Sequence, residues 1–215
     1  VLMMVIVLIL VQAAGTSPGS LKVEASKRLH GRGGKRLNGG NPMATTFHLP
    51  PLLAEGKTWA VIDKPAGLAV HPGPRTPASL EDLLPRLARH GVAPQPVHRL
   101  DRDTSGCLLM AYRPSALRTL SRAFVAGQVE KRYWALVEGR LAAEAGRVDA
   151  PLLKVSTART GWRMVVDPQG QVAATRWRRI GRIGELSLVE FRPETGRTHQ
   201  IRVHGTLMGE GTALV

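Results

Sequence analysis

The hydrophobic and polar positions along the chain predict many short strands joined by turns. Apolar runs at Trp59–Ile62, Leu68–Val70 and Cys107–Ala111 are bounded by glycine, proline or polar residues, as buried strands usually are. From residue 129 to 138 the side chains alternate between two faces, which is the period of a strand. Three further strands are expected in the second half of the chain, at residues 163–166, 175–180 and 186–191.

Three segments have the spacing of helices. The clearest begins at Pro114, which suits a first helical turn, and Gly127 is well placed to end it. A second helix follows the N-cap residue Ser79 and is shortened by Pro85. A third is expected from about Arg197 to Met208. Few helices among many short strands predict an α+β fold, with a mixed, mainly antiparallel sheet flanked by helices, rather than a doubly wound fold.

The first 42 residues differ in composition from the rest. An apolar run from Val1 to Val11 precedes a stretch rich in glycine, serine and basic residues. The run resembles the apolar part of a signal peptide, but no basic residue precedes it, so we favour an over-extended, disordered N-terminus with Met43 as the start. Residues 1–42 are therefore interpreted as a leader and residues 43–215 as one domain. No apolar run reaches the roughly 18 residues that span a bilayer.

Charge and cysteine content narrow the possible functions. The chain has 30 lysines and arginines against 16 acidic residues, a net charge of +14, and 43% of its residues are hydrophobic. Without residues 1–42, 24 basic and 15 acidic residues remain, a net charge of +9, so the domain itself favours a polyanionic partner. The single cysteine, Cys107, excludes a disulfide scaffold and a cysteine-based zinc site. We expect a monomeric cytoplasmic protein that binds no membrane.

The segment from His98 to Gly106 holds the most informative candidate chemistry. Asp101 is flanked by Arg99 and Arg102, and nearby positive charges keep a carboxylate ionised. Such a group suits a nucleophile or base that works without a metal. On charge pattern alone, a surface loop with weak ion pairs is the favoured alternative. Asp101 and Asp103 together could suggest a divalent metal, but no further acids cluster nearby, and we expect no metal site.

Four segments, in order, resemble the motifs of one family. They are DKPAGLAVHPG at 63–73, HRLDRDTSG at 98–106, KRYWALV at 131–137 and TGRTHQIRVH at 195–204. The third of these corresponds to a K-x-Y-x-A-x-V strand, and the second to an HRLDxxTSG signature. The chain is identified by these motifs as similar to RluA-type pseudouridine synthases, which are RNA uridine isomerases. The resemblance covers roughly residues 59–204.

The resemblance implies the isomerisation of uridine in ribosomal or transfer RNA, with no cofactor and no metal. Asp101 would be the catalytic carboxylate, attacking the ribose C1′ or acting as a base at C2′. Arg202 would pair with Asp101, and Tyr133 would stack on the target uracil and assist proton removal from C5. The predicted substrate-binding residues are Arg99, which would fill the gap left by the flipped nucleotide, His98, Lys64, Arg197 and Ile201. We interpret the histidines, including His199 and His204, as RNA-contacting or structural.

Two departures from the family pattern affect the domain prediction. The family's G-D-x-x-Y-G stretch and closing strand are not apparent after residue 204, so we expect a domain that is truncated at its C-terminus, with a final helix that no strand follows. The leader is too short for the S4 RNA-binding domain of many relatives. Two alternatives to the isomerase remain open, namely a non-catalytic basic RNA-binding protein and a metal-dependent transferase that uses Asp101 and Asp103.

Overall fold

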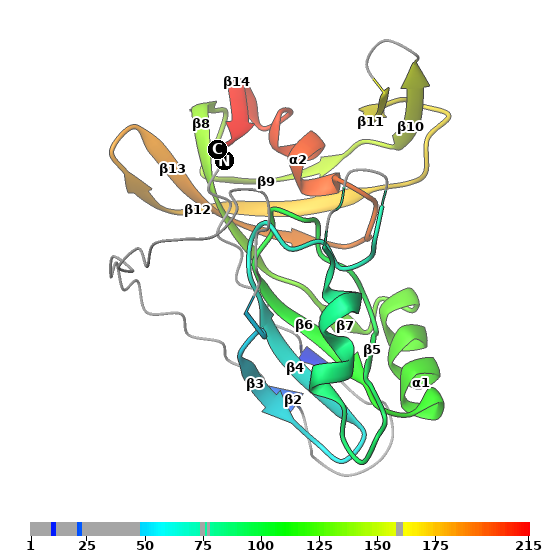
Figure 1. Ribbon diagram of the computed structural model, residues 1–215. Coiled ribbons are helices and arrows are strands. Elements are labelled where there is room, and N and C mark those ends of the chain that lie inside the picture. Colours follow the sequence, from blue (N-terminus) through cyan, green and yellow to red (C-terminus); the bar gives the residue numbers. More distant parts are fainter. Residues whose placement is uncertain (1–9, 12–20, 23–47, 74–75, 77, 158–160) are drawn as a thin grey trace, which may run out of the picture.

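The computed structural model of the protein describes residues 10–11, 21–22, 48–73, 76, 78–157 and 161–215. Its two largest sheets contain five and four strands. Figure 1 shows the five-stranded sheet in the upper half of the molecule and the four-stranded sheet in the lower half. Most of the predicted leader, and the predicted start at Met43, lie outside the described residues.

The five-stranded sheet is antiparallel throughout. Its strands, in spatial order, are β14 (Gly209–Leu214), β8 (Tyr133–Leu141), β13 (Leu186–Pro193), β12 (Ala174–Ile183) and β9 (Ala145–Asp149). On one face Ala135 lies opposite Val189 and Tyr133 lies opposite Phe191, and Ala135, Val189 and Phe191 are buried in the core. Successive side chains point to opposite faces, so Tyr133 is directed to the core side of the sheet.

The four-stranded sheet is also antiparallel. Its strands are, in order, β3 (Leu52–Glu55), β4 (Trp59–Lys64), β6 (Gly106–Ala111) and β5 (Gln95–Pro96). β4 and β6 carry uninterrupted apolar runs because both faces of these central strands are buried. Lys64 pairs with Gly106 at the end of the two strands. The loop after β4 and the loop before β6 therefore leave the sheet side by side.

The remaining elements surround these sheets. They are the 3₁₀ helix η1 (Leu80–Leu87), α1 (Pro114–Val125), α2 (Gln200–Gly205), the hairpin of β10 (Leu152–Thr157) and β11 (Gly161–Val166), and a small sheet of β1 (Leu10–Val11), β2 (Leu21–Lys22) and β7 (Val129–Glu130). In Figure 1 the β10–β11 hairpin extends on the far side of α2 from β14. Within the described residues, no helix has the length and apolar character to cross a membrane.

Most local predictions from the sequence agree with the structure. The strands predicted at 59–62, 107–111, 175–180 and 186–191 are present with slightly longer bounds. α1 begins at Pro114, and Gly127 follows its end with a positive φ of 68°, a conformation that glycine adopts without strain. Ser79 caps η1 through a capping box with Asp82.

Four local predictions were wrong. Residues 68–70 form no strand but a single bridge from Ala69 to Ser79. The strand expected over 129–138 is divided after Glu130, because β7 pairs with β1 whereas β8, from Tyr133, pairs with β13 and β14 of another sheet. The third helix is limited to Gln200–Gly205 because the residues before it form a turn. Finally, a strand does follow that helix: β14 pairs with β8.

Candidate active site

Asp101 lies in the loop that connects β5 and β6. Buried Leu100, Thr104 and Ser105 anchor this loop on both sides of the acid. A backbone hydrogen bond of 3.1 Å from Thr104 N to the Asp101 carbonyl closes a turn. The Asp101 side chain keeps 24% of its surface exposed. A firmly anchored loop thus presents one carboxylate to an approaching molecule.

Lys64 supports the loop that carries Asp101 from the protein interior. Its side chain has no exposed surface, and Nζ donates hydrogen bonds to the carbonyls of Pro65 (2.8 Å), Leu68 (2.6 Å) and Arg102 (3.1 Å). Burial lowers the pKa of Lys64 to about 8, although the charges of Asp103 and Asp101 oppose the shift. The sequence-based assignment of Lys64 to substrate binding is not supported, because all three ammonium hydrogens are directed at backbone carbonyls.

His98 also holds the loop in place. Its Nε2 accepts a hydrogen bond of 3.1 Å from Leu109 N of β6, and its ring stacks on Phe124 of α1 at 4.6 Å between centroids. Burial lowers the pKa of His98 to about 4. A hydrogen bond with the Arg99 backbone raises the pKa, but this effect is smaller than that of burial. The neutral imidazole is therefore a packing element of the loop, and this geometry does not favour the predicted substrate contact.

Tyr133 faces the same region from the first position of β8. Burial raises the pKa of its phenol well above the usual range, and the charge of Asp101 raises it further. The phenol is consequently protonated at neutral pH. It offers an aromatic face and a hydroxyl donor near the carboxylate, rather than a phenolate base.

The segment before and within α2 provides the opposite wall. His199 precedes α2 in the left-handed conformation, with φ 53° and ψ 17°, which is rare for a non-glycine residue and clusters at functional sites. Its Nε2 lies 3.8 Å from Asp101 Oδ2. Arg202 Nη2 lies 3.7 Å from Asp103 Oδ2. No ion pair joins Arg202 to Asp101 in the described part of the chain, so the predicted pairing was wrong.

Buried hydrogen bonds fix this wall on the core face of β12. Gln200 Nε2 donates to the Ala174 carbonyl at 3.0 Å and to Thr175 Oγ1 at 2.9 Å. His204 contacts the same hydroxyl at 2.8 Å. Gln200 Oε1 accepts from Arg197 N at 2.9 Å, which ties the preceding turn to the helix. A short helix is thereby held rigidly enough to position His199 and Arg202.

Three other predicted substrate-binding residues differ in their surroundings. Arg99 is exposed and makes no ion pair with another described residue. Arg197 is exposed and donates a hydrogen bond from Nε to the Val172 carbonyl at 3.0 Å. The pKa of Lys131 is lowered mainly by the burial of Lys131 itself and further by the charge of Arg197. Ile201 is half-buried and packs against the core. Of these three, Arg99 is the side chain most available to a ligand.

Comparison with known proteins identifies the family. A sequence profile described as RNA pseudouridylate synthase matches residues 58–206. The chain belongs to this family. An uncharacterized RNA pseudouridine synthase of Zymomonas mobilis is 52% identical over 146 residues, which cover 67% of this chain and 66% of that protein. The ribosomal large subunit pseudouridine synthase C of Vibrio cholerae is 42% identical over 153 residues, which cover 71% of this chain and 48% of that protein. The chain thus spans about half to two thirds of these relatives.

Solved structures of pseudouridylate synthases share the fold. Human RNA pseudouridylate synthase domain containing 4 superimposes with a TM-score of 0.64 and 30% identity, over 76% of this chain and 66% of that chain. Human RNA pseudouridylate synthase domain containing 1 superimposes with a TM-score of 0.63 at 24% identity, which shows a similarity of fold alone. The predicted family and the predicted α+β fold are both confirmed.

The structure brings together some of the predicted site residues of this family member and adds others. Asp101, Tyr133 and Arg202 face one region, whereas Lys64 and His98 support it from within. The sequence analysis considered Asp103 only as one of two acids in a possible metal site, and it gave no site role to Gln200 or to Trp162, whose ring stacks on His199. For Asp103 and Gln200 the available signal was position, since they lie inside the HRLDRDTSG and TGRTHQIRVH motifs. No group of three metal-ligating side chains is found among the described residues.

Proposed function

We propose that this protein converts uridines of RNA to pseudouridine, with Asp101 as the catalytic carboxylate. The observation that carries the proposal is the position of Asp101: a partly exposed acid in the family's loop, with Tyr133 and His199 beside it and a buried lysine beneath. An RNA-binding surface gains nothing from an acid that faces phosphate, whereas an isomerase requires a group that acts on the ribose. The geometry therefore favours the isomerase over a non-catalytic RNA-binding protein.

In the proposed reaction the bond between C1′ and N1 breaks, the uracil rotates, and a bond between C1′ and C5 forms. Asp101 either attacks C1′, and is displaced when C5 attacks, or removes and returns a proton at C2′. The proton on C5 is then lost and N1 takes up a proton, so the product is an isomer of the substrate. Tyr133, neutral at physiological pH, serves as a stacking surface for the uracil, an interaction worth about 1–3 kcal/mol.

The target nucleotide must leave its stack before Asp101 can reach it. Extrusion costs a few kcal/mol, and the exposed guanidinium of Arg99 is free to occupy the vacated space. A guanidinium stacks on bases and also neutralises phosphate. The net charge of the domain supports RNA as the partner, and the names of relatives such as the Vibrio cholerae protein make ribosomal large-subunit RNA the first substrate to test. Transfer RNA is the second, and we propose a cytoplasmic monomer.

The deciding experiment incubates the purified protein with ribosomal large-subunit RNA and transfer RNA from cells that lack its gene. Chemical labelling of pseudouridine should reveal modified positions with the wild type, both with and without EDTA. Asp101→Asn should abolish their formation while RNA affinity stays within severalfold, because the carboxylate performs chemistry rather than binding. Turnover by Asp101→Asn would show that the carboxylate is misassigned. A wild type that binds RNA without modifying it would favour the non-catalytic alternative.

A further inference from the structure

Trp162 is a large aromatic side chain with an unusual degree of exposure. It lies at the second position of β11, opposite Ser156 of β10, and 47% of its surface is exposed. A β-strand indole that serves only packing is normally well covered by its neighbours. In Figure 1 the β10–β11 hairpin extends beyond α2 and away from the cores of the two large sheets. The indole thus lies on a projecting hairpin rather than within the core.

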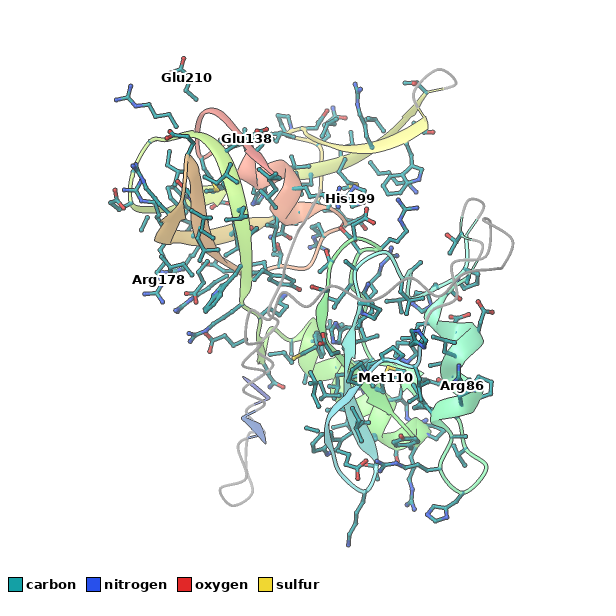
Figure 2. All side chains as sticks on the ribbon, turned by 60° about the vertical axis from the view of Figure 1, so that its left-hand side comes forward. Arg86, Met110, Glu138, Arg178, His199 and Glu210 are labelled. Atoms are coloured by element: carbon teal, nitrogen blue, oxygen red, sulfur yellow. The ribbon has the colours of Figure 1, made fainter. Side chains whose placement is uncertain are left out.

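The exposed indole is separated from Asp101 by a single side chain, that of His199. The Trp162 and His199 rings stack with centroids 5.1 Å apart and an interplanar angle of 25°. His199 Nε2 in turn lies 3.8 Å from Asp101 Oδ2. Figure 2 places His199 where the upper and lower parts of the molecule meet, on the side of the hairpin. Trp162 and Asp101 therefore both contact the same imidazole, so the indole lies close to the carboxylate.

A positive charge accompanies the aromatic ring. Lys154 Nζ lies 4.9 Å from the centroid of the Trp162 ring, and Lys154 is exposed. The register of the hairpin pairs Lys154 with Met164 and Ser156 with Trp162, so these four residues share one face. Arg163, also exposed, lies on the other face because it alternates with Trp162. Among the described residues of the hairpin, only the face toward His199 combines an aromatic surface with a cation, the arrangement by which proteins bind single-stranded nucleic acid.

We propose that this face of the hairpin binds the single-stranded RNA next to the target uridine. A base adjacent to the flipped nucleotide stacks on Trp162, and Lys154, released from the ring, contacts a phosphate of the same strand. The proposal rests on the proposed function, because that function determines which nucleotide enters the site. Flipping removes the stacking partner of the neighbouring base, and the indole provides a replacement at the required place.

A simpler role for Trp162 makes a different prediction. If the indole only orients His199, and through it Asp101, then its loss lowers kcat and leaves RNA affinity unchanged. If it binds RNA, its loss raises Kd and KM by similar factors and changes kcat little. The two roles are therefore separated by measuring affinity and turnover on the same variants.

The binding experiment uses a short fluorescein-labelled single-stranded oligouridine and fluorescence anisotropy. Trp162→Leu should raise Kd about tenfold, and Trp162→Phe should recover most of the loss because stacking accepts any aromatic ring. Lys154→Gln should weaken binding and reduce the salt dependence by about one counterion. Arg163→Ala is the matched control: it removes a charge from the other face of the same hairpin, and Kd should rise less than threefold. Thermal melts verify that each variant is folded.

Three outcomes would overturn the proposal. One is an unchanged Kd in folded Trp162→Leu, and another is an equal loss in Arg163→Ala. The third is a fall in kcat with unchanged KM, which would assign Trp162 to orienting His199. Anisotropy requires no pseudouridine formation, so it separates this proposal from the proposed function. Selective loss of binding in Trp162→Leu supports the hairpin site even if the wild type proves inactive, and an active wild type with an unchanged Trp162→Leu refutes the hairpin site alone.

Discussion

Arg202 Nη2 lies 3.7 Å from Asp103 Oδ2 and connects α2 with the loop that carries Asp101. The neighbouring contact, from His199 to Asp101, links the same two segments. Arg202 Nε is buried and has no hydrogen-bond partner within the described residues. The Arg202 guanidinium thus holds the loop through Asp103, and we infer that Arg202 positions Asp101 indirectly.

This arrangement predicts coupling between Arg202 and Asp103. Arg202→Gln and Asp103→Asn should each lower the single-turnover rate of pseudouridine formation by about 10- to 100-fold, and the double variant should be little worse than either, because both remove one contact. Stability should change by about 1 kcal/mol or less, since the pair is roughly one-third exposed on each side. Additive effects would contradict the indirect role, as would normal activity in Asp103→Asn.

Lys64 should be essential for stability. Lys64→Met leaves three carbonyl groups of the two loops without their donor, which should lower the free energy of unfolding by about 2–4 kcal/mol. Pseudouridine formation should fall as well, since these loops carry Asp101. Lys57→Met is the matched control: it removes an exposed lysine and should change stability by about 0.5 kcal/mol or less. Urea unfolding compares the two, and equal stability would refute a supporting role for Lys64.

His98 should make the fold sensitive to acid. Its pKa in the folded protein is lowered to about 4 from 6.5, so between these values the unfolded chain binds a proton that the folded chain does not. Stability therefore falls as pH decreases from 6.5 to 4, by at most about 3 kcal/mol from this residue.

His98→Gln retains an acceptor for Leu109 N but cannot titrate. Its stability, measured by urea unfolding at pH 7, 5.5 and 4.5, should decline less steeply than that of the wild type. The pKa of His204 is also lowered by burial, and its contribution to the pH dependence of stability is the same in the wild type and in His98→Gln. Identical pH profiles would mean that His98 is not protected from protonation in the fold.

RNA binding should depend steeply on salt, because the domain carries a net positive charge and binding releases counterions. If Arg99 contacts phosphate, Arg99→Ala should reduce the slope of log K against log salt by about 1. Arg86→Ala provides a control, since Arg86 is also exposed but lies on η1, well away from His199 in Figure 2. A flat salt dependence of the wild type would argue against a nucleic acid partner, and equal slopes for both variants would remove Arg99 from the RNA-binding surface.

Local patterns in the sequence were sufficient for the elements whose stabilisation is mostly local or strongly apolar. β4, β6 and α1 were predicted because their apolar runs or helical spacing are continuous. β9 escaped prediction: of its five residues only Val148 is buried, so no alternation marks the strand. β14 was overlooked for a similar reason, because its first three residues are Gly209, Glu210 and Gly211, and it becomes a strand by pairing with β8.

The sequence by itself determined the family, the general fold class and the candidacy of Asp101, because those depend on motifs that are contiguous along the chain. Only the tertiary structure decided which side chains meet: Arg202 pairs with Asp103, and His199 lies between Asp101 and Trp162. These contacts join residues far apart in sequence, and their partners depend on how α2, the hairpin and the loop before β6 are anchored to different sheets. Whether Lys64 reaches a ligand or a carbonyl was likewise decided by burial, which no local pattern of charges specifies.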